Sequence, residues 1–324
     1  MSDPLVWVIG RGLLGSHVTQ ALRRHVPEAQ LWQSTPAHFS WTNAAQLAED
    51  LNGAVPAFAA AAHGSGKAWA LVWCAGKGAV NSPAEVLEPE WWAWTRLLKL
   101  LSRHLARPRN NLLGYIFLAS STGGLYGGNL RELVSEYSPP QPVSEYGAHK
   151  FRMEEALRNW AEAFSNVSCL IGRISTLYGP GQDLRKAQGI IAHLSRCLIY
   201  RCPANIYVPL DTRRDYLFVD DCARQIAAGL RRLMSERPRV ILKILASEHS
   251  TSLAQIVGVF FRIAKHRSLI VSRQASGIQS ISLRFRSNIW RDLENRGNTE
   301  LAVGIHLLHE YQLGLFQRGL LPPP

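Results

Sequence analysis

The residue types that could carry out chemistry gather between positions 112 and 150. The apolar run over 112–119 predicts a strand buried in a parallel sheet, because it is short, aliphatic and bounded by glycine and polar residues. Hydroxyl side chains follow this run directly and end with Thr122. In open α/β sheets ligands bind at the carboxyl ends of the strands, so these hydroxyls are candidate site residues.

A tyrosine and a lysine follow a proline-rich loop. Tyr146 and Lys150 are four apart in a segment with a helical pattern, so they would lie one turn apart on the same face. A nearby ammonium favours the phenolate and should lower the tyrosine pKa from its usual value of about 10. Such a tyrosine can act as an acid or a base near neutral pH. Many solvated helices carry this spacing by chance, but the upstream hydroxyls favour the catalytic interpretation.

A glycine-rich turn near the amino terminus predicts a dinucleotide site. A short apolar strand over 5–9 leads into Gly10, Gly12 and Gly15, and a helical pattern follows. The first glycine permits a tight turn, the second lets the backbone approach a pyrophosphate, and the third lets helix and strand pack closely. The amino end of the helix attracts the anion. A turn with only a structural role is the alternative.

The second predicted strand, over 30–34, bears on which cofactor is bound. An NAD-binding fold usually places Asp or Glu at the end of this strand to hold a ribose hydroxyl. This chain has Gln33 and Ser34 there, and no carboxylate. Arg11 lies in the glycine turn, where a guanidinium could reach a 2′-phosphate. We therefore favour NADP(H), with NAD(H) possible; a solvent-facing Arg11 without a role is the alternative.

The order of these motifs resembles the extended short-chain dehydrogenase/reductase family, whose epimerases, dehydratases and reductases act largely on nucleotide sugars. In that family a Ser-Ser-x-x-x-(Val)-Tyr-Gly strand end precedes Tyr-x-x-x-Lys, as 120–127 precedes 146–150 here. Two later segments, 173–180 and 214–221, resemble the family patterns Arg-x-x-Asn-x-Tyr-Gly-Pro and Arg-Asp-Phe/Tyr-x-x-Val-Asp-Asp. The resemblance covers about the first 235 residues.

The resemblance implies a fold and its division. We expect a Rossmann-type α/β fold, a doubly wound parallel sheet with a smaller carboxyl-terminal substrate domain. The dinucleotide domain would span residues 1–180, with 215–246 returning to it. Residues 181–214 and 247–324 would form the substrate domain.

The resemblance also implies roles for single residues. Thr122, Tyr146 and Lys150 match the catalytic triad, in which Tyr146 exchanges a proton with the substrate oxygen. The implied cofactor-binding residues are Gly10, Arg11, Gly12, Leu13, Leu14, Gly15, Gln33, Ser34, Cys74, Ala75, Gly76, Ser120, Tyr146, Lys150 and Arg173. Substrate would contact Ser121, Thr176 and Arg214, although Thr176 stands where the family often has asparagine.

The reaction class is narrowed by two departures from family patterns. Sugar dehydratases of the family have Asp-Glu directly after the catalytic threonine, and this chain has Gly123 and Gly124 there, so dehydration is disfavoured. The missing carboxylate after the second strand favours a reductase over an NAD-dependent nucleotide-sugar epimerase. A dinucleotide-binding sensor or structural protein without turnover is the alternative of another class. Such relatives usually lose the tyrosine or the lysine, and this chain keeps both.

Composition limits the partners. With 324 residues, 47% hydrophobic and 19% charged, the chain is globular. The net charge of +12 comes from dispersed arginines, which fits an anionic small substrate better than nucleic acid, because no nucleic-acid motif accompanies it. A solvated basic surface without a role is equally compatible with this charge. The five cysteines lack metal-ligand spacing, and we expect no metal. No apolar run approaches the length of a membrane span, and the opening 1–4 lacks a basic signal-peptide start, so we expect a cytoplasmic protein without a membrane partner.

Three further expectations concern local structure and assembly. The tryptophans at 91, 92 and 94 indicate either a homodimer surface or core packing, and we expect a homodimer. The Gly/Ser-rich end of an alanine-rich stretch, 59–66, predicts a surface loop. The segment Ser250-Thr251-Ser252-Leu253 predicts the start of a capped helix.

Overall fold

The computed structural model describes residues 3–41, 43–106, 112–129, 133–184, 189–237, 239–263, 270–272, 282–293 and 297–324. Contacts divide the chain into two interleaved units. The first contains residues 1–128, 139–174 and 223–243, and the second contains 129–138, 175–222 and 244–324. The predicted division also interleaves two domains, but its dinucleotide domain includes 129–138, 175–180, 215–222 and 244–246, which belong to the second unit.

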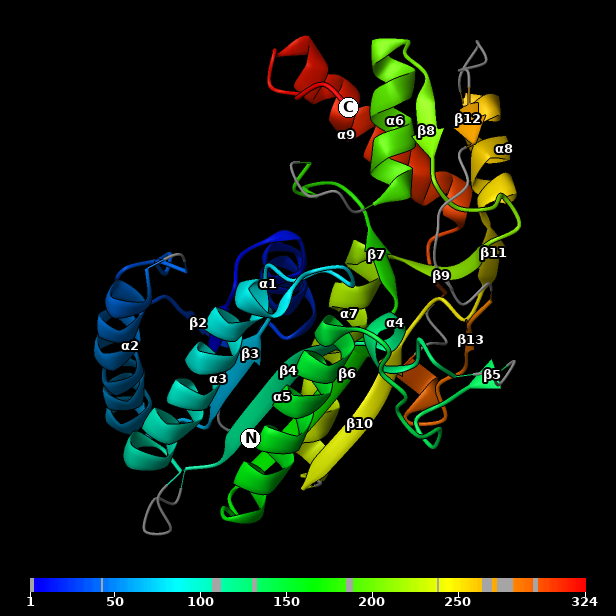
Figure 1. The fold of residues 1–324 in the computed structure, drawn as a ribbon. Coiled ribbons are helices and arrows are strands. Elements are labelled where there is room, and N and C mark those ends of the chain that lie inside the picture. The colour runs from blue at the N-terminus through cyan, green and yellow to red at the C-terminus, as the bar shows by residue number, and fades with distance from the viewer. Residues whose placement is uncertain are drawn as a thin grey trace. The chain divides into compact units, whose positions relative to one another are not determined.

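A six-stranded sheet forms the centre of the first unit (Figure 1). Its strands, in chain order, are β1 (Leu5–Ile9), β2 (Gln30–Trp32), β3 (Trp69–Trp73), β4 (Gly114–Ser121), β6 (Val167–Ile174) and β10 (Val240–Leu245). They lie in the order β10-β6-β4-β3-β1-β2, and the registers of β1 with β2 and β3, of β3 with β4 and of β4 with β6 are parallel. The predicted doubly wound α/β fold is confirmed. The strand order reverses between β1 and β3, and ligands bind at such a switch point.

Helices cover both faces of this sheet. They are α1 (Leu13–His25), α2 (Ala44–Ser65), α3 (Ala84–His104), α5 (Glu145–Glu162) and α7 (Val219–Glu236), and the short α4 (Thr122–Leu125) directly follows β4. α2, α3 and α5 bury their apolar stripes against one face, where alternate strand residues such as Trp7, Trp73 and Ile171 form the core. On the opposite face Tyr115 of β4 donates a hydrogen bond to the carbonyl of Met234 in α7 at 3.5 Å.

The predicted surface loop over 59–66 is wrong. α2 continues through these residues to Ser65 and ends where Gly66 adopts a left-handed conformation, with φ 63°. Alanine is the strongest helix former, and Ala59 and Ala62 face the core, so propensity and burial both extend the helix. Only the last turn uses the glycine and serine that suggested a loop.

The second unit contains short strands and three longer helices. Its strands are β5 (Leu133–Val134), β7 (Thr176–Tyr178), β8 (Ala204–Ile206), β9 (Arg213–Phe218), β11 (Ser250–Ser252), β12 (Ile270–Ser272) and β13 (Arg284–Phe285). Its helices are α6 (Ile190–Tyr200), α8 (Leu253–Ile263) and α9 (Leu301–Gln317), with a 3-10 turn at Arg291–Leu293. β9 lies between β7 and β11, and β12 pairs with β8 and β13 with β5.

The capped helix start predicted within 250–253 is confirmed. Residues 250–252 form β11, which pairs with β9, and Ser252 caps α8, which begins at Leu253. The Ser252 hydroxyl accepts from the backbone N–H of Gln255 at 3.2 Å, and the Gln255 side chain accepts from the N–H of Ser252 at 2.8 Å. This is a capping box.

Among the helices of the described residues, none has both the length and the apolar character that crossing a bilayer requires.

Candidate active site

In the glycine turn between β1 and α1, Gly10 and Gly15 pack closely against backbone atoms, whereas Gly12 has free space around its Cα. Gly10 has φ +90°, and a Cβ there would lie 2.3 Å from the backbone nitrogen of Ala75, beyond the end of β3. A Cβ on Gly15 would lie 2.1 Å from the carbonyl oxygen of Gly10. A Cβ on Gly12 would meet nothing within 4 Å. The turn therefore presses against the sheet on one side and leaves backbone approachable at Gly12.

The amino end of α1 fits an anion. Gly12 is its N-cap residue, no side chain makes a capping hydrogen bond there, and the first turn holds no acidic residue. Backbone N–H groups in the first turn of a helix lack partners within the helix and carry partial positive charge. Leu13 and Leu14 begin the helix and Arg11 lies partly exposed in the turn. These features fit the pyrophosphate of a dinucleotide.

The ends of β2 and β3 border this turn. After β2, Gln33 is exposed, and the buried Ser34 donates a hydrogen bond to the carbonyl of Pro36 at 2.8 Å. After β3, Cys74 is partly buried, Ala75 is buried and Gly76 is exposed with φ +141°. The backbones of both Cys74 and Ala75 lie against the glycine turn, since a Cβ on Gly10 would lie 2.6 Å from the carbonyl carbon of Cys74 and 2.3 Å from the nitrogen of Ala75.

The three hydroxyls at the end of β4 all have partners. Ser120 donates to the carboxylate of Glu154 at 2.6 Å. Ser121 caps α4 by accepting from the N–H of Gly124 at 3.2 Å. Thr122 is 1% exposed and donates to the carbonyl of Ile174, at the end of β6, at 3.3 Å.

Tyr146 lies between two glycines. Ser144 caps α5 by accepting from the N–H of Gly147 at 3.1 Å, which places Tyr146 in the first turn. Its ring is partly exposed, and a Cβ on Gly78 or on Gly124 would lie only 3.2 Å or 3.1 Å from ring carbons. A larger residue at position 124 would therefore push the ring away. This gives a physical reason for glycine directly before the end of α4.

Lys150 lies one turn after Tyr146 and is held by a carboxylate that the sequence did not reveal. Its Nζ lies 5.8 Å from the centroid of the Tyr146 ring and 2.6 Å from Oε1 of Glu90 in α3. The side chains of Lys150 and Glu90 are 7% and 5% exposed. Burial alone would lower the pKa of Lys150, but the negative charges of Glu90 and Tyr146 outweigh it and hold that pKa above its ordinary value.

The sequence feature that could have identified Glu90 as a buried residue is its position on the apolar stripe of a helix. Leu87, Glu90, Trp94 and Leu97 are three or four apart and are all buried on one stripe of α3. A lone carboxylate on an apolar stripe needs a buried partner. The sequence alone did not identify which residue supplies it, since Lys150 is 60 residues away.

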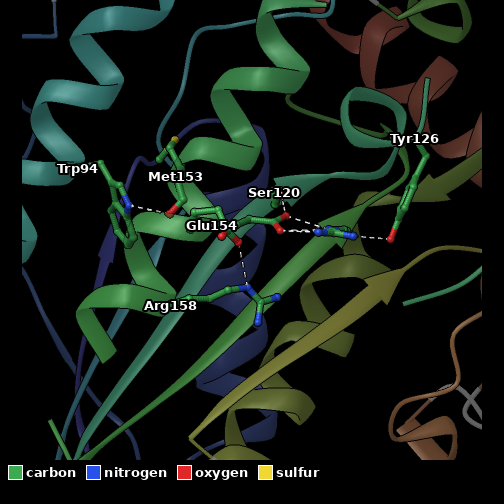
Figure 2. A network of polar contacts seen from close by, with 8 residues as sticks. Trp94, Ser120, Tyr126, Met153, Glu154 and Arg158 are labelled. Atoms are coloured by element: carbon green, nitrogen blue, oxygen red, sulfur yellow. Dashed lines mark hydrogen bonds and ion pairs between the residues drawn. The ribbon is translucent and has the colours of Figure 1, made fainter. Parts of the chain in front are cut away.

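A second buried network lies one turn further along α5 (Figure 2). Glu154 is fully buried, and its Oε2 lies 2.6 Å from the guanidinium of Arg173 in β6. Arg173 also hydrogen-bonds the hydroxyl of Tyr126 at 2.5 Å, and Ser120 donates to the same carboxylate. Burial alone would lower the pKa of Arg173, but Glu154 raises it above its ordinary value. The polar groups of Ser120 and Arg173 are thus bound to protein partners, and their predicted contact with cofactor stays a prediction.

The predicted substrate residues divide between the units. Ser121 belongs to the first unit, whereas Thr176 and Arg214 belong to β7 and β9 of the second. Thr176 is exposed and Arg214 partly buried. Next to Arg214, the buried Asp215 accepts hydrogen bonds from Ser175 at 2.6 Å and from the Ser247 hydroxyl at 2.9 Å. In the described residues no group of three or more His, Cys, Asp or Glu side chains is arranged to hold a metal ion.

Relatives of known name match parts of the chain. The dTDP-L-rhamnose 4-epimerase of Burkholderia thailandensis is 32% identical over 133 residues, which make up 41% of this chain and 35% of that enzyme. The chain spans about a third of the length of the curated relatives it matches.

Solved structures match almost the whole chain. MoeE5 in complex with UDP-glucose and NAD superposes with a TM-score of 0.69 at 20% identity, covering 98% of this chain and 99% of that one. RMD from Pseudomonas aeruginosa complexed with NADPH gives a TM-score of 0.74 at 19% identity, covering 96% of this chain and 99% of that one. At these identities the similarity establishes the fold.

A family model decides the membership. The model of the NAD-dependent epimerase/dehydratase family matches residues 6–242, which include the glycine turn, the hydroxyl strand end and the Tyr-x-x-x-Lys helix. The sequence motifs, the doubly wound sheet and this match agree, and the chain belongs to the NAD-dependent epimerase/dehydratase family, the extended short-chain dehydrogenases/reductases that its motifs resemble.

Proposed function

We propose that this chain is an NAD(P)-dependent oxidoreductase that acts at a hydroxyl-bearing or ketone carbon of a small substrate, with Thr122, Tyr146 and Lys150 as its catalytic residues. One observation carries the proposal. The Tyr146 ring is confined between Gly78 and Gly124, with the ammonium of Lys150 5.8 Å from its centroid. A confined phenol beside a fixed cation is suited to proton transfer.

The residues around the glycine turn would hold the cofactor. The open backbone at Gly12 and the uncapped amino end of α1 would bind the pyrophosphate. When bound, the nicotinamide supplies hydride transfer. We favour NADP(H), because residues 33–35 provide no carboxylate and Arg11 lies in the turn. Among the structural neighbours, one holds NADPH and another holds NAD, so NAD(H) is the alternative.

The chain's own groups account for the proton chemistry. Tyr146 would give a proton to the substrate oxygen during reduction and take one during oxidation. Lys150 keeps positive charge beside the phenol, and the two ammonium hydrogens that Glu90 does not use can bind cofactor hydroxyls. Thr122 donates to Ile174, but its oxygen can still accept a hydrogen bond from a substrate hydroxyl.

A reductase is the favoured reaction and an epimerase the second candidate. The missing carboxylate after β2 favours a reductase that releases its oxidised cofactor. The epimerase candidate rests on the Burkholderia relative, which is a nucleotide-sugar epimerase. For either reaction we propose a nucleotide sugar as substrate, because MoeE5 binds UDP-glucose and Arg214 could pair with a phosphate.

A homodimer is part of the proposal. Of the three tryptophans in α3, Trp94 is fully buried and Trp91 packs against Arg152, whose guanidinium lies 3.7 Å from the ring centroid. Trp92 is 38% exposed, and so is Val86 at 46% on the same helix. These exposed apolar residues are the candidate dimer contact. Light scattering of the Trp92→Glu variant tests it, with dissociation expected.

The first experiment is titration of the purified protein with NADPH and NADH, together with mass spectrometry of any nucleotide it carries. Exchangeable NADPH supports a reductase, and tightly held NAD supports an epimerase. Binding of neither refutes the proposal. Once a substrate is found, Tyr146→Phe should lower kcat about 10²-fold or more while cofactor affinity is kept. Tyr137→Phe, at a tyrosine that is 74% exposed, is the matched control. Unchanged turnover of Tyr146→Phe would remove Tyr146 from the mechanism.

A further inference from the structure

Glu90 is a charged residue in a place where charge is costly. It lies on the apolar stripe of α3, its side chain is 5% exposed, and its Oε1 accepts from Nζ of Lys150 at 2.6 Å. Its Oε2 lies 3.5 Å from Nε2 of His149. A Cβ on Gly76 would lie 2.8 Å from that same Oε2, so the carboxylate lies against the loop that follows β3.

Lys150 depends on this carboxylate for its charge. A buried ammonium without a counterion loses its proton, because desolvation disfavours the charged form. Among the described groups that act on Lys150, Glu90 from α3 is the one carboxylate, and the others are the Tyr146 phenol and the Cys74 thiol. Burial raises the pKa of the Cys74 thiol to about 12, which keeps it neutral. His149 faces Glu90 from α5, where it competes for the carboxylate.

The helix packing fixes where the pair lies. One turn beyond Glu90, the indole of Trp94 donates to the carbonyl of Met153 at 3.2 Å, so α3 and α5 are joined again next to the pair. At the surface, Arg152 of α5 pairs with Glu88 of α3 at 3.3 Å, with side chains 52% and 59% exposed. These contacts hold the backbones of α3 and α5 together on both sides of the pair.

We propose that Glu90 is a positioning residue of this site, whose buried carboxylate keeps the ammonium of Lys150 charged and fixed beside Tyr146. The part that Lys150 plays in turnover rests on the proposed function, but the effect of Glu90 on Lys150 does not. Glu90 acts through the lysine and need not touch substrate or cofactor.

The test follows the lysine directly. Protein labelled with ¹³C at the lysine ε-carbon is titrated by NMR, and the Lys150 signal is assigned by its loss in Lys150→Met. We expect the Lys150 midpoint of the parent chain to lie above the ordinary lysine value, and Glu90→Gln to lower that midpoint by about 2 pH units or more. Glu88→Gln removes a carboxylate that is also paired with α5 but is exposed, and should leave the midpoint unchanged. An unchanged midpoint in Glu90→Gln would overturn the proposal.

Two further measurements separate positioning from mere packing. Glu90→Asp keeps the charge and should restore most of the Lys150 midpoint; if it behaves as Glu90→Gln does, packing explains the effect. In the Lys150→Met background, adding Glu90→Gln should raise the melting temperature, because it removes a carboxylate left buried without its cation. A lower melting temperature of the double variant would contradict the assignment, and this comparison does not require Glu90→Gln alone to fold.

A pH–rate profile joins the lysine to turnover. With a substrate in hand, Glu90→Gln should move the acidic limb of the profile for oxidation, in which Tyr146 takes a proton, by about one pH unit or more toward higher pH, because the cation that favours the phenolate is lost. Glu88→Gln should not move it. If Tyr146→Phe retains turnover, the proposed function fails, whereas the Lys150 titration still decides the role of Glu90. An unmoved profile with a shifted Lys150 midpoint would refute the link to catalysis.

Discussion

Replacing Glu154 with Gln should cost about 3–5 kcal/mol of the free energy of unfolding. Gln keeps the shape of the side chain but removes the charge that Arg173 faces across 2.6 Å, and both side chains are at most 3% exposed. The guanidinium would then stay buried beside the Tyr126 hydroxyl without a counterion. A loss of this size is a large share of the 5–15 kcal/mol that typically stabilises a folded chain.

The chain supplies its own control for this variant. Glu155 pairs with Arg158 on the surface of the same helix at 3.6 Å, with side chains 48% and 33% exposed. Solvent screens such a pair, so Glu155→Gln should cost about 1 kcal/mol or less. Replacing both buried partners, as Glu154→Leu with Arg173→Met, should recover part of the loss, because no unpaired charge remains.

Urea unfolding followed by far-ultraviolet circular dichroism and tryptophan fluorescence measures these free energies. The two signals must report the same transition before a single free energy is taken from it, because the chain has two units. An equal loss in Glu154→Gln and Glu155→Gln would refute the reasoning, since it would mean that burial does not decide the cost. A loss below about 1 kcal/mol in Glu154→Gln would refute it as well.

Three other outcomes are expected. Gly12→Ala should weaken NADPH binding in a fluorescence titration without changing the unfolding midpoint, whereas Gly10→Ala should lower that midpoint, because its Cβ would lie 2.3 Å from backbone. Gly124→Ala should reduce turnover, because its Cβ would lie 3.1 Å from a carbon of the Tyr146 ring and would displace that ring. Gly123→Ala should leave turnover unchanged, because its Cβ would meet nothing within 4 Å. Burial alone would raise the pKa of Glu90, but its paired ammonium holds that pKa below the usual range. The pair should therefore stabilise the fold above the ordinary carboxylate pKa and lose this contribution as the pH falls through the lower folded value, and Glu90→Gln should flatten that part of the stability curve.

Short motifs predicted the fold and the positions of candidate groups because each is read from a few neighbouring residues. The glycine turn needs a strand before it and a helix after it, and the structure has β1 and α1 on its two sides. The Tyr146 to Lys150 spacing needs only helical geometry, and both residues lie in α5. The Gly/Ser-rich composition of 59–66 indicated a loop, but the helix propensity and burial of its alanines extended α2 to Ser65.

Pairing between distant elements could not be predicted in the same way. Glu90 and Lys150 are 60 residues apart, and the contact depends on how α3 packs on α5. The carboxylate on the apolar stripe of α3 indicates a buried polar partner, but the stripe does not identify that partner. The chain has six lysines besides Lys150 and many arginines, and any of them was an acceptable partner before the packing of the two helices was known.

Helix α5 shows how buried pairs place the reactive tyrosine. Tyr146, Lys150 and Glu154 recur at every fourth position, so they lie along one face, and the last two are buried. A face that sends an ammonium and a carboxylate into the core must receive opposite charges from its neighbours, and α3 provides Glu90 while β6 provides Arg173. The helix is thus fixed at two successive turns behind Tyr146. Because each pair is costly to break by removing one partner, rotation or sliding of α5 is opposed, and the phenol stays at the end of β4.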